Sequence, residues 1–184
     1  MTTRLFVLIL ILFAQPAFST AATHKSGQEI SLLKTVFIYN FAKFTRWPES
    51  QPEKNQDSIT FCSVGNDSIT SGLQMLNGKK LKGRTIKVIH LNTDTTNIKS
   101  CNVIYLSKSS ELKTEYILQE ISDTPCLTIS EMPDFLKYGG MIELQSYKDK
   151  VRFSINLATT RAAGLEISAR LLNLATIVEE TALP

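Results

Sequence analysis

The chain has 184 residues, 43% of them hydrophobic, and its 20 Lys and Arg against 17 Asp and Glu give a formal net charge of +3. Such a chain fits one domain with a hydrophobic core. The basic residues are scattered, which argues against a nucleic-acid-binding protein, and their one cluster, residues 79–84, is interpreted as a solvated turn.

Residues 1–22 are predicted to be a secretory signal peptide, because Arg4 precedes an apolar run and small residues follow it. The alternative is an N-terminal core helix. We expect cleavage near Ala21 or Ala22, since the apolar run is too short to remain as a membrane span. The rest, a single domain over 23–180, is then exported and is not membrane-embedded.

The first half of the mature chain begins with an aromatic helix. Apolar residues recur every three or four positions over Gln28–Phe44, and Pro48 stops the helix soon afterwards. Its phenylalanines are interpreted as core. A flexible loop at Glu49–Asp57 precedes three predicted elements, which are a strand at Ser58–Val64, a helix capped by Asp67 or Ser68 and running to Leu76, and a strand at Arg84–Leu91.

The second half alternates strands and helices and then forms a β-hairpin. The predicted elements are a strand at Cys101–Leu106, a helix capped by Ser109 or Ser110 and ending at Ile121, a strand at Cys126–Ser130, a short helix at Glu131–Tyr138, and hairpin strands at Met141–Tyr147 and Val151–Ile155. A closing helical region, capped by Asn156 and bent at Gly164, is expected to continue through Thr176, with Glu166 and Arg170 paired across one turn.

This order predicts an α/β fold. We expect a single-domain sandwich with a mostly parallel, roughly six-stranded sheet, an antiparallel C-terminal hairpin, and helices on both faces.

Three cysteines, Cys62, Cys101 and Cys126, are present. Cys62 and Cys101 each lie on or beside a predicted strand, where neighbouring strands could bring them within bridging range. Such a bridge would contribute roughly 3–4 kcal/mol. Cys126 is interpreted as a small buried hydrophobe, although its role stays open.

No catalytic, metal or cofactor site is predicted. The only two histidines, His24 and His90, are isolated from each other and from the cysteines, and no Cys-x-x-Cys occurs. The turn after the first strand, from Val64 to Ser68, lacks the paired glycines of a nucleotide-binding fingerprint. We therefore expect a protein that is not an enzyme.

Several motifs along the chain carry a family resemblance. They are Tyr39-Asn-Phe-x-x-Phe-x-x-Trp-Pro48, Phe61-Cys-x-Val-Gly65, Leu81-x-Gly-Arg-x-Ile86, Cys101-x-Val-x-Tyr-Leu106, Leu127-Thr-Ile-Ser130, Phe135-x-x-x-Gly-Gly-Met-Ile142, Val151-Arg-Phe-x-Ile-Asn-Leu157, Arg161-x-x-Gly-Leu165 and Ser168-x-Arg-Leu-Leu172. In this order the chain resembles the YfiR-like family of bacterial periplasmic proteins over nearly its whole mature length.

The resemblance implies a regulator. It would repress an inner-membrane diguanylate cyclase by binding the cyclase's periplasmic sensor domain, and so lower cyclic-di-GMP signalling and biofilm formation. The family fold is α/β and often a homodimer, and a disulfide stabilises it, at positions that match Cys62 and Cys101. Members can carry a second cysteine pair, whereas this chain has only Cys126 in its C-terminal half.

Tyr39 and Trp47 are the candidate partner-binding residues, because Tyr and Trp favour interfaces. Trp47 is equally interpretable as a plug at the end of the sheet. Arg152, Arg161 and Arg170 could bind an anion together, but we expect them to pair with Glu143, Glu166 or Asp149.

The alternative function is a periplasmic small-ligand sensor for another membrane signalling protein. Its ligand would lie beyond the carboxyl ends of the strands, near Gly65, Leu91, Leu106 and Ser130.

Overall fold

A computed structural model describes residues 27–48, 57–91, 97–147 and 150–179. The predicted signal peptide, its cleavage sites, His24 and most of the predicted loop at Glu49–Asp57 lie outside these ranges.

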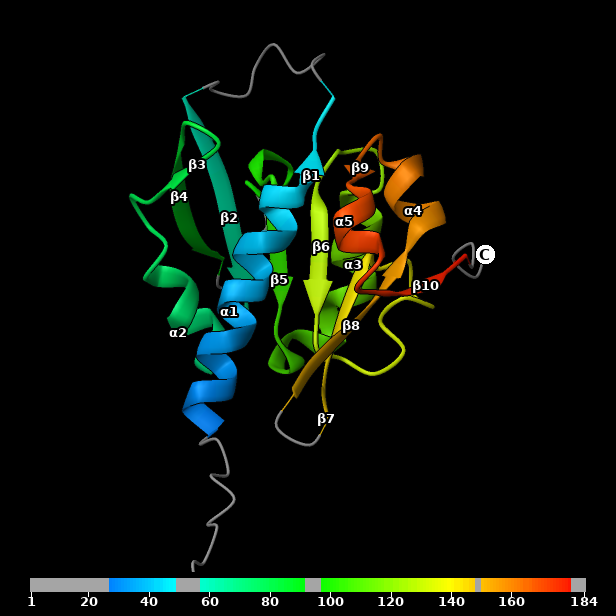
Figure 1. Cartoon of the computed structure of the whole chain (residues 1–184), viewed down its shortest axis with the longest axis horizontal. Helices are drawn as coiled ribbons and strands as arrows, with labels where there is room; N and C mark the ends of the chain where they lie inside the picture. The colour runs from blue at the N-terminus through cyan, green and yellow to red at the C-terminus, as the bar shows by residue number, and fades with distance from the viewer. Residues whose placement is uncertain (1–26, 49–56, 92–96, 148–149, 180–184) are drawn as a thin grey trace, which may run out of the picture.

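The centre of the fold is an eight-stranded sheet (Figure 1). Its strands, from one edge to the other, are β10 (Thr176–Val178), β8 (Lys150–Asn156), β7 (Ile142–Tyr147), β6 (Leu127–Ser130), β5 (Val103–Leu106), β2 (Ser58–Val64), β4 (Arg84–Leu91) and β3 (Lys80–Leu81). Only the pairs β7–β8 and β3–β4 are antiparallel. The expected mostly parallel α/β fold is confirmed, and the two short edge strands enlarge the expected sheet.

Helices cover both faces of the sheet (Figure 1). On one face lie α1 (Gly27–Phe44), α2 (Ser68–Gln74) and α5 (Ala169–Leu172), and α3 (Glu111–Glu120) lies on the other. Neighbouring residues of β2 point to opposite faces, so that Phe61 belongs to the core under α1 and Cys62 to the core under α3. Burial on both faces explains why β5, in the middle of the sheet, reads Val-Ile-Tyr-Leu rather than alternating apolar with polar residues.

The buried stripe of α1 differs slightly from the predicted one. Ile38, Phe41 and Ala42 are fully buried, whereas Phe37 and Phe44 are partly buried and pack against the core. Phe41 and Phe37 both contact Phe153 of β8, with ring centroids 4.8 and 5.8 Å apart. The helix therefore crosses the sheet with its aromatic side chains between the two layers, as expected.

The predicted helix at Glu131–Tyr138 is wrong. This segment is a series of turns, with hydrogen bonds from Phe135 N to Met132 O and from Lys137 N to Asp134 O. Asp134 has φ of 61°, in the left-handed region that an α-helix cannot contain.

The closing helical region is also not continuous. After α4 (Leu157–Ala162) the chain forms β9 (Glu166–Ile167), then α5, then the edge strand β10, which includes Thr176. β9 pairs with β1 (Thr45–Arg46), and β10 pairs with β8. The helical spacing of the apolar residues in this region follows from the burial of Leu165 and Leu171. The backbone conformation is instead set by hydrogen bonds to distant strands.

Two further local expectations change. The predicted pair of Glu166 and Arg170 does not form: Glu166 pairs with Arg46 across β1 and β9, at 3.0 Å, and Arg170 lies against the Phe44 ring. The helix α2 ends at Gln74 rather than Leu76, and turns follow it.

Candidate functional site

The sheet has a topological switch point between β2 and β5. The carboxyl ends of these strands are paired, but beyond them the chain passes to α2 on one face of the sheet and to α3 on the other face. Open α/β sheets bind ligands at such a crevice. This edge is therefore the first place to look for a site, and it agrees with the position predicted for a ligand.

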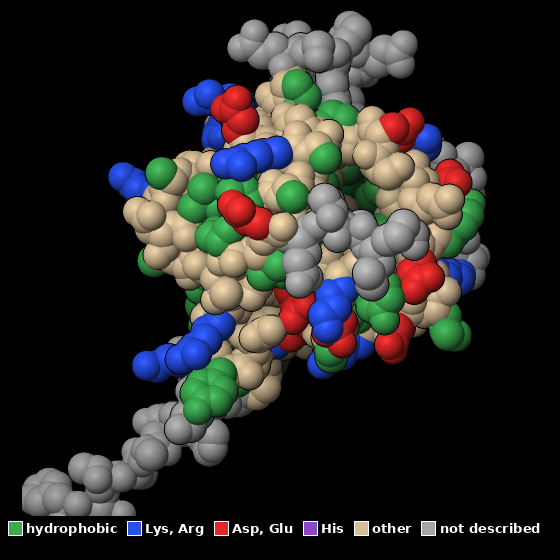
Figure 2. Space-filling model, turned by 90° about the vertical axis from the view of Figure 1, so that its right-hand side faces the viewer, with side chains coloured by type: hydrophobic (Ala, Val, Ile, Leu, Met, Phe, Trp, Pro, Cys, Tyr) green, Lys and Arg blue, Asp and Glu red, His purple; other side chains and the backbone are tan. Residues whose placement is uncertain are grey.

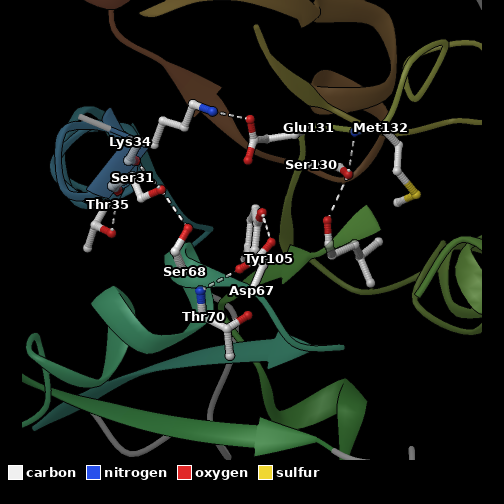
Figure 3. Close-up of polar contacts among 12 residues, drawn as sticks. Ser31, Lys34, Thr35, Asp67, Ser68, Thr70, Tyr105, Ser130, Glu131 and Met132 are labelled. Carbon is white, nitrogen blue, oxygen red and sulfur yellow. Dashed lines mark hydrogen bonds and ion pairs between the residues drawn. The ribbon is translucent and has the colours of Figure 1, made fainter. Parts of the chain in front are cut away.

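A network of polar side chains fills this edge (Figure 3). Asp67, which follows β2, caps α2 by accepting from the Thr70 backbone N–H at 2.7 Å. Its second oxygen accepts from the hydroxyl of Tyr105, in β5, at 2.6 Å. One carboxylate therefore holds both a helix start and a strand end.

Tyr105 is fully buried, and its pKa is raised above the ordinary value of 10.0. Burial is the largest cause, and the neighbouring carboxylates of Asp67 and Glu131 add to it, because all three disfavour the phenolate. The hydroxyl therefore stays protonated and acts as a hydrogen-bond donor. It is poorly suited to act as a base.

The helix α1 is fastened to the same edge (Figure 3). Lys34 forms an ion pair with Glu131, which follows β6, and only 9% of the lysine side chain is exposed. The hydroxyls of Ser31 and Ser68 lie 2.6 Å apart and connect α1 to the start of α2. Because a buried charge is costly without a partner, this pair joins α1 to the end of β6.

Internal contacts occupy the predicted ligand position. A Cβ on Gly65 would lie 2.1 Å from the Ser107 Oγ and 2.5 Å from the Ser109 Oγ, so these hydroxyls sit directly against the glycine. The Ser130 hydroxyl donates to the Leu106 carbonyl at 2.7 Å. The network thus stabilises the junction of α1, α2 and the sheet, and its polar groups bind one another.

A cleft of about 870 Å³ lies elsewhere, on the α3 face. Its walls come from α3, the turns before β7, and α4, including Leu118, Tyr138 and Ala162, and Met141 and Cys126 also line it. This volume is within the range of small-molecule sites. Sequence reasoning missed it, because the walls come from segments that are far apart in the chain.

The structure contains a disulfide between Cys62 and Cys101, with a Cα–Cα distance of 5.9 Å. Cys62 lies in β2, and Cys101 precedes the neighbouring strand β5. Asn102 strengthens the same junction, since its side chain accepts from Thr60 N and its backbone N–H donates to Thr60 O, both at 2.9 Å. Cys126 is buried and takes no part in this disulfide, as expected of a small hydrophobe.

Tyr39 and Trp47, the predicted contact residues, both lie at the margin of the core and are half-buried. The Tyr39 hydroxyl donates to the Lys80 carbonyl at 3.1 Å, and the ring borders a cavity of about 310 Å³ between α1 and the chain after α2. The Trp47 indole N–H is buried without a hydrogen-bond partner among the described residues. Their binding role stays a prediction.

Among the described residues, Arg152, Arg161 and Arg170 do not form the expected ion pairs. Arg152 lies over the Tyr147 ring at 4.9 Å, Arg170 lies 6.0 Å from the Phe44 ring, and Arg161 is exposed at the end of α4. Of their predicted partners, Glu143 accepts from Gln145, Glu166 pairs with Arg46, and Asp149 lies outside the described residues. Arg152 and Arg170 therefore make aromatic contacts, each with a different ring.

Within the described ranges, no group of three His, Cys, Asp or Glu side chains is placed to hold a metal ion. His90 lies 3.1 Å from the Ser63 hydroxyl. No helix in the same part of the chain is long and apolar enough to span a membrane.

Known proteins resemble this chain in sequence pattern and in structure. Residues 31–176 match the model of a family described as YfiR/HmsC-like. A crystal structure of a conserved domain protein from Vibrio cholerae O1 biovar El Tor is similar, with a TM-score of 0.47 and 14% sequence identity. The alignment covers 68% of this chain and 56% of the Vibrio chain. No curated protein gives a significant match.

Proposed function

Because this chain belongs to the YfiR/HmsC-like family, we propose that it is a periplasmic regulatory protein that represses an inner-membrane diguanylate cyclase. It would bind the cyclase's periplasmic sensor domain and hold it in an inactive state, by stronger binding to that state. Cyclic-di-GMP and biofilm formation would fall as a result. In this proposal the mature domain, residues 23–180, acts after removal of the leader at Ala21 or Ala22, and pairs as a homodimer.

The family match over residues 31–176 carries this proposal. Two structural features support a binding role over a catalytic one. The Cys62–Cys101 disulfide suits an oxidising compartment such as the periplasm. The polar groups at the switch point, including Asp67 and Tyr105, bind each other and hold helices in place.

A deletion strain tests the proposal. Loss of the gene should raise cellular cyclic-di-GMP, measured by mass spectrometry, and the full chain should restore the lower level. A matched variant that lacks residues 1–22 should not restore it, because it would remain in the cytoplasm. Deletion of the cyclase in the same strain should remove the rise. Unchanged cyclic-di-GMP in the deletion strain would refute repression.

The cleft on the α3 face favours a second candidate, a sensor that binds a small molecule. Its volume of about 870 Å³ and its mixed lining, from Leu118 and Met141 to Tyr138, suit a ligand with an apolar body. Periplasmic metabolites should then raise the melting temperature of the purified domain. Ala162→Phe, which narrows the cleft, should abolish that rise. A melting temperature unchanged by every metabolite would argue against this candidate.

A further inference from the structure

An exposed groove lies between α1 and the turn after α2. We refer to Val36, Tyr39, Leu76, Lys79 and Lys80, which line its cavity of about 310 Å³, as the basic groove. The floor is apolar and comes from both elements, while the two lysines are exposed at its margin. The cavity has room for a side chain rather than for a large ligand.

The apolar residues around the basic groove are strongly exposed to solvent. Val36 is 47% exposed, and Leu32, one helical turn earlier, is 49% exposed. Met75, beside Leu76, is 64% exposed. Apolar side chains gathered in this way on an otherwise polar surface are typical of an interaction site.

The charge of this region has one sign. From Ser68 to Leu91 the chain has five Lys or Arg and no Asp or Glu. Near the groove, the Lys82 amino group donates to the Thr45 carbonyl, and its pKa is lowered by burial and by the neighbouring Arg46. Cations are therefore held close together. By contrast, the face in Figure 2 mixes both signs of charge.

We propose that the basic groove binds an acidic, amphipathic segment of a partner protein. An apolar side chain of that segment would insert between Val36, Tyr39 and Leu76, and flanking Asp or Glu residues would pair with Lys79 and Lys80. A concave cavity of this size fits an inserted side chain, whereas a flat lipid surface would contact only the protruding residues. The identity of the partner, a membrane cyclase, rests on the proposed function, but the chemistry of the surface does not.

Site-specific photocrosslinking in living cells tests the groove. Benzoylphenylalanine would replace Val36 or Tyr39 in the full chain, with Leu112 and Tyr116, which are exposed on α3, as control positions. Mass spectrometry would then identify the crosslinked protein and peptide. We expect the same partner from both groove positions, linked through a segment that contains Asp or Glu.

Charge reversal separates the groove from a general charge effect. Lys79→Glu with Lys80→Glu should lower the adduct yield at position 36 by about tenfold or more, since like charges would then face the partner. Lys108→Glu with Lys113→Glu makes the same change of net charge on exposed residues elsewhere and should leave the yield unchanged. Circular dichroism confirms that both variants are folded.

Each outcome decides between the two claims. Adducts with a partner that carries no cyclase domain, lost on reversal at Lys79 and Lys80, would support the groove and refute the proposed function. Adducts with a cyclase that form only from position 112 or 116 would support the proposed function and refute the groove. The absence of a protein adduct at Val36 and Tyr39, or binding of the purified domain to anionic phospholipid vesicles through these lysines, would overturn the groove proposal.

Discussion

Removal of the Cys62–Cys101 disulfide should strongly destabilise the fold and leave the surface intact. The bridged residues are 39 positions apart in the chain. The chain-entropy model assigns a loop of that length about 4 kcal/mol of stability, through the freedom that the bridge removes from the unfolded chain. Because small domains unfold with about 5–15 kcal/mol in total, this one bond supplies a large share.

The perturbation is Cys62→Ala with Cys101→Ala. Both side chains are at most 1% exposed, so the double variant also loses some packing in the core under α3. Cys126→Ala measures that packing loss, because Cys126 is also 1% exposed and belongs to the same core. Twice the stability loss of Cys126→Ala is subtracted from the stability loss of the double variant. The remainder is the contribution of the disulfide itself.

Equilibrium urea unfolding, followed by circular dichroism with and without reductant, is the assay. Wild type should lose about 4 kcal/mol when reductant is present, since unfolding exposes the bridge to it. The double variant should be equally weak in both conditions, and Cys126→Ala should keep the sensitivity of wild type to reductant. A wild type whose midpoint does not move with reductant, or a double variant within about 1 kcal/mol of wild type after the packing correction, would refute the reasoning.

Three further predictions concern the polar edge of the sheet. Gly65→Ala should lower the free energy of unfolding by about 2–4 kcal/mol, because Gly65 has a positive φ and no room for a Cβ. Gly78 has nearly the same φ but open space around it, so Gly78→Ala should cost only about 1 kcal/mol. Similar losses for the two variants in thermal unfolding would contradict this prediction. The raised pKa of Tyr105 in the folded state stabilises the fold fully at pH values below about 10, the pKa of tyrosine in the unfolded chain, and this contribution is lost as the pH rises from there toward the folded-state pKa. Tyr105→Phe should therefore reduce the decrease of the free energy of unfolding above about pH 10. An unchanged slope of that free energy against pH would exclude Tyr105 as its cause. Lys34→Met should lower the free energy of unfolding by about 3 kcal/mol, because it leaves the Glu131 carboxylate without its partner. Adding Glu131→Leu to that variant should recover much of the loss, as measured by urea unfolding. Equal stability of wild type and Lys34→Met would show that the ion pair contributes nothing.

The elements that were predicted well are those whose signal is local. Ser58–Val64 and Arg84–Leu91 are strands with the predicted bounds, because short runs rich in β-branched residues between turns favour extended backbone. Asp67 and Asn156 cap helices as expected, since each side chain reaches a backbone N–H only three residues further on.

The polar edge was only partly predictable. Asp67 was recognised as a cap but not as the partner of Tyr105, which is distant in the sequence. One signal was available for the ion pair: Lys34 lies four residues before the buried Ile38, on the same side of α1, and a lysine there needs a buried anion. The sequence pattern could not show that Glu131 supplies it.

The sequence by itself determined the family and the order of the strands in the chain, because these depend on local pattern. It left open which strands are neighbours, and only the tertiary structure places β2 beside β5 and so Cys62 beside Cys101. Only the tertiary structure decided the path after Asn156, where a segment with helical spacing of its apolar residues instead pairs with the distant strands β1 and β8. It also decided the packing of α1 beside the turn after α2, which creates the basic groove. Local spacing reports which residues are buried, whereas long-range hydrogen bonding and packing choose the partners against which they are buried.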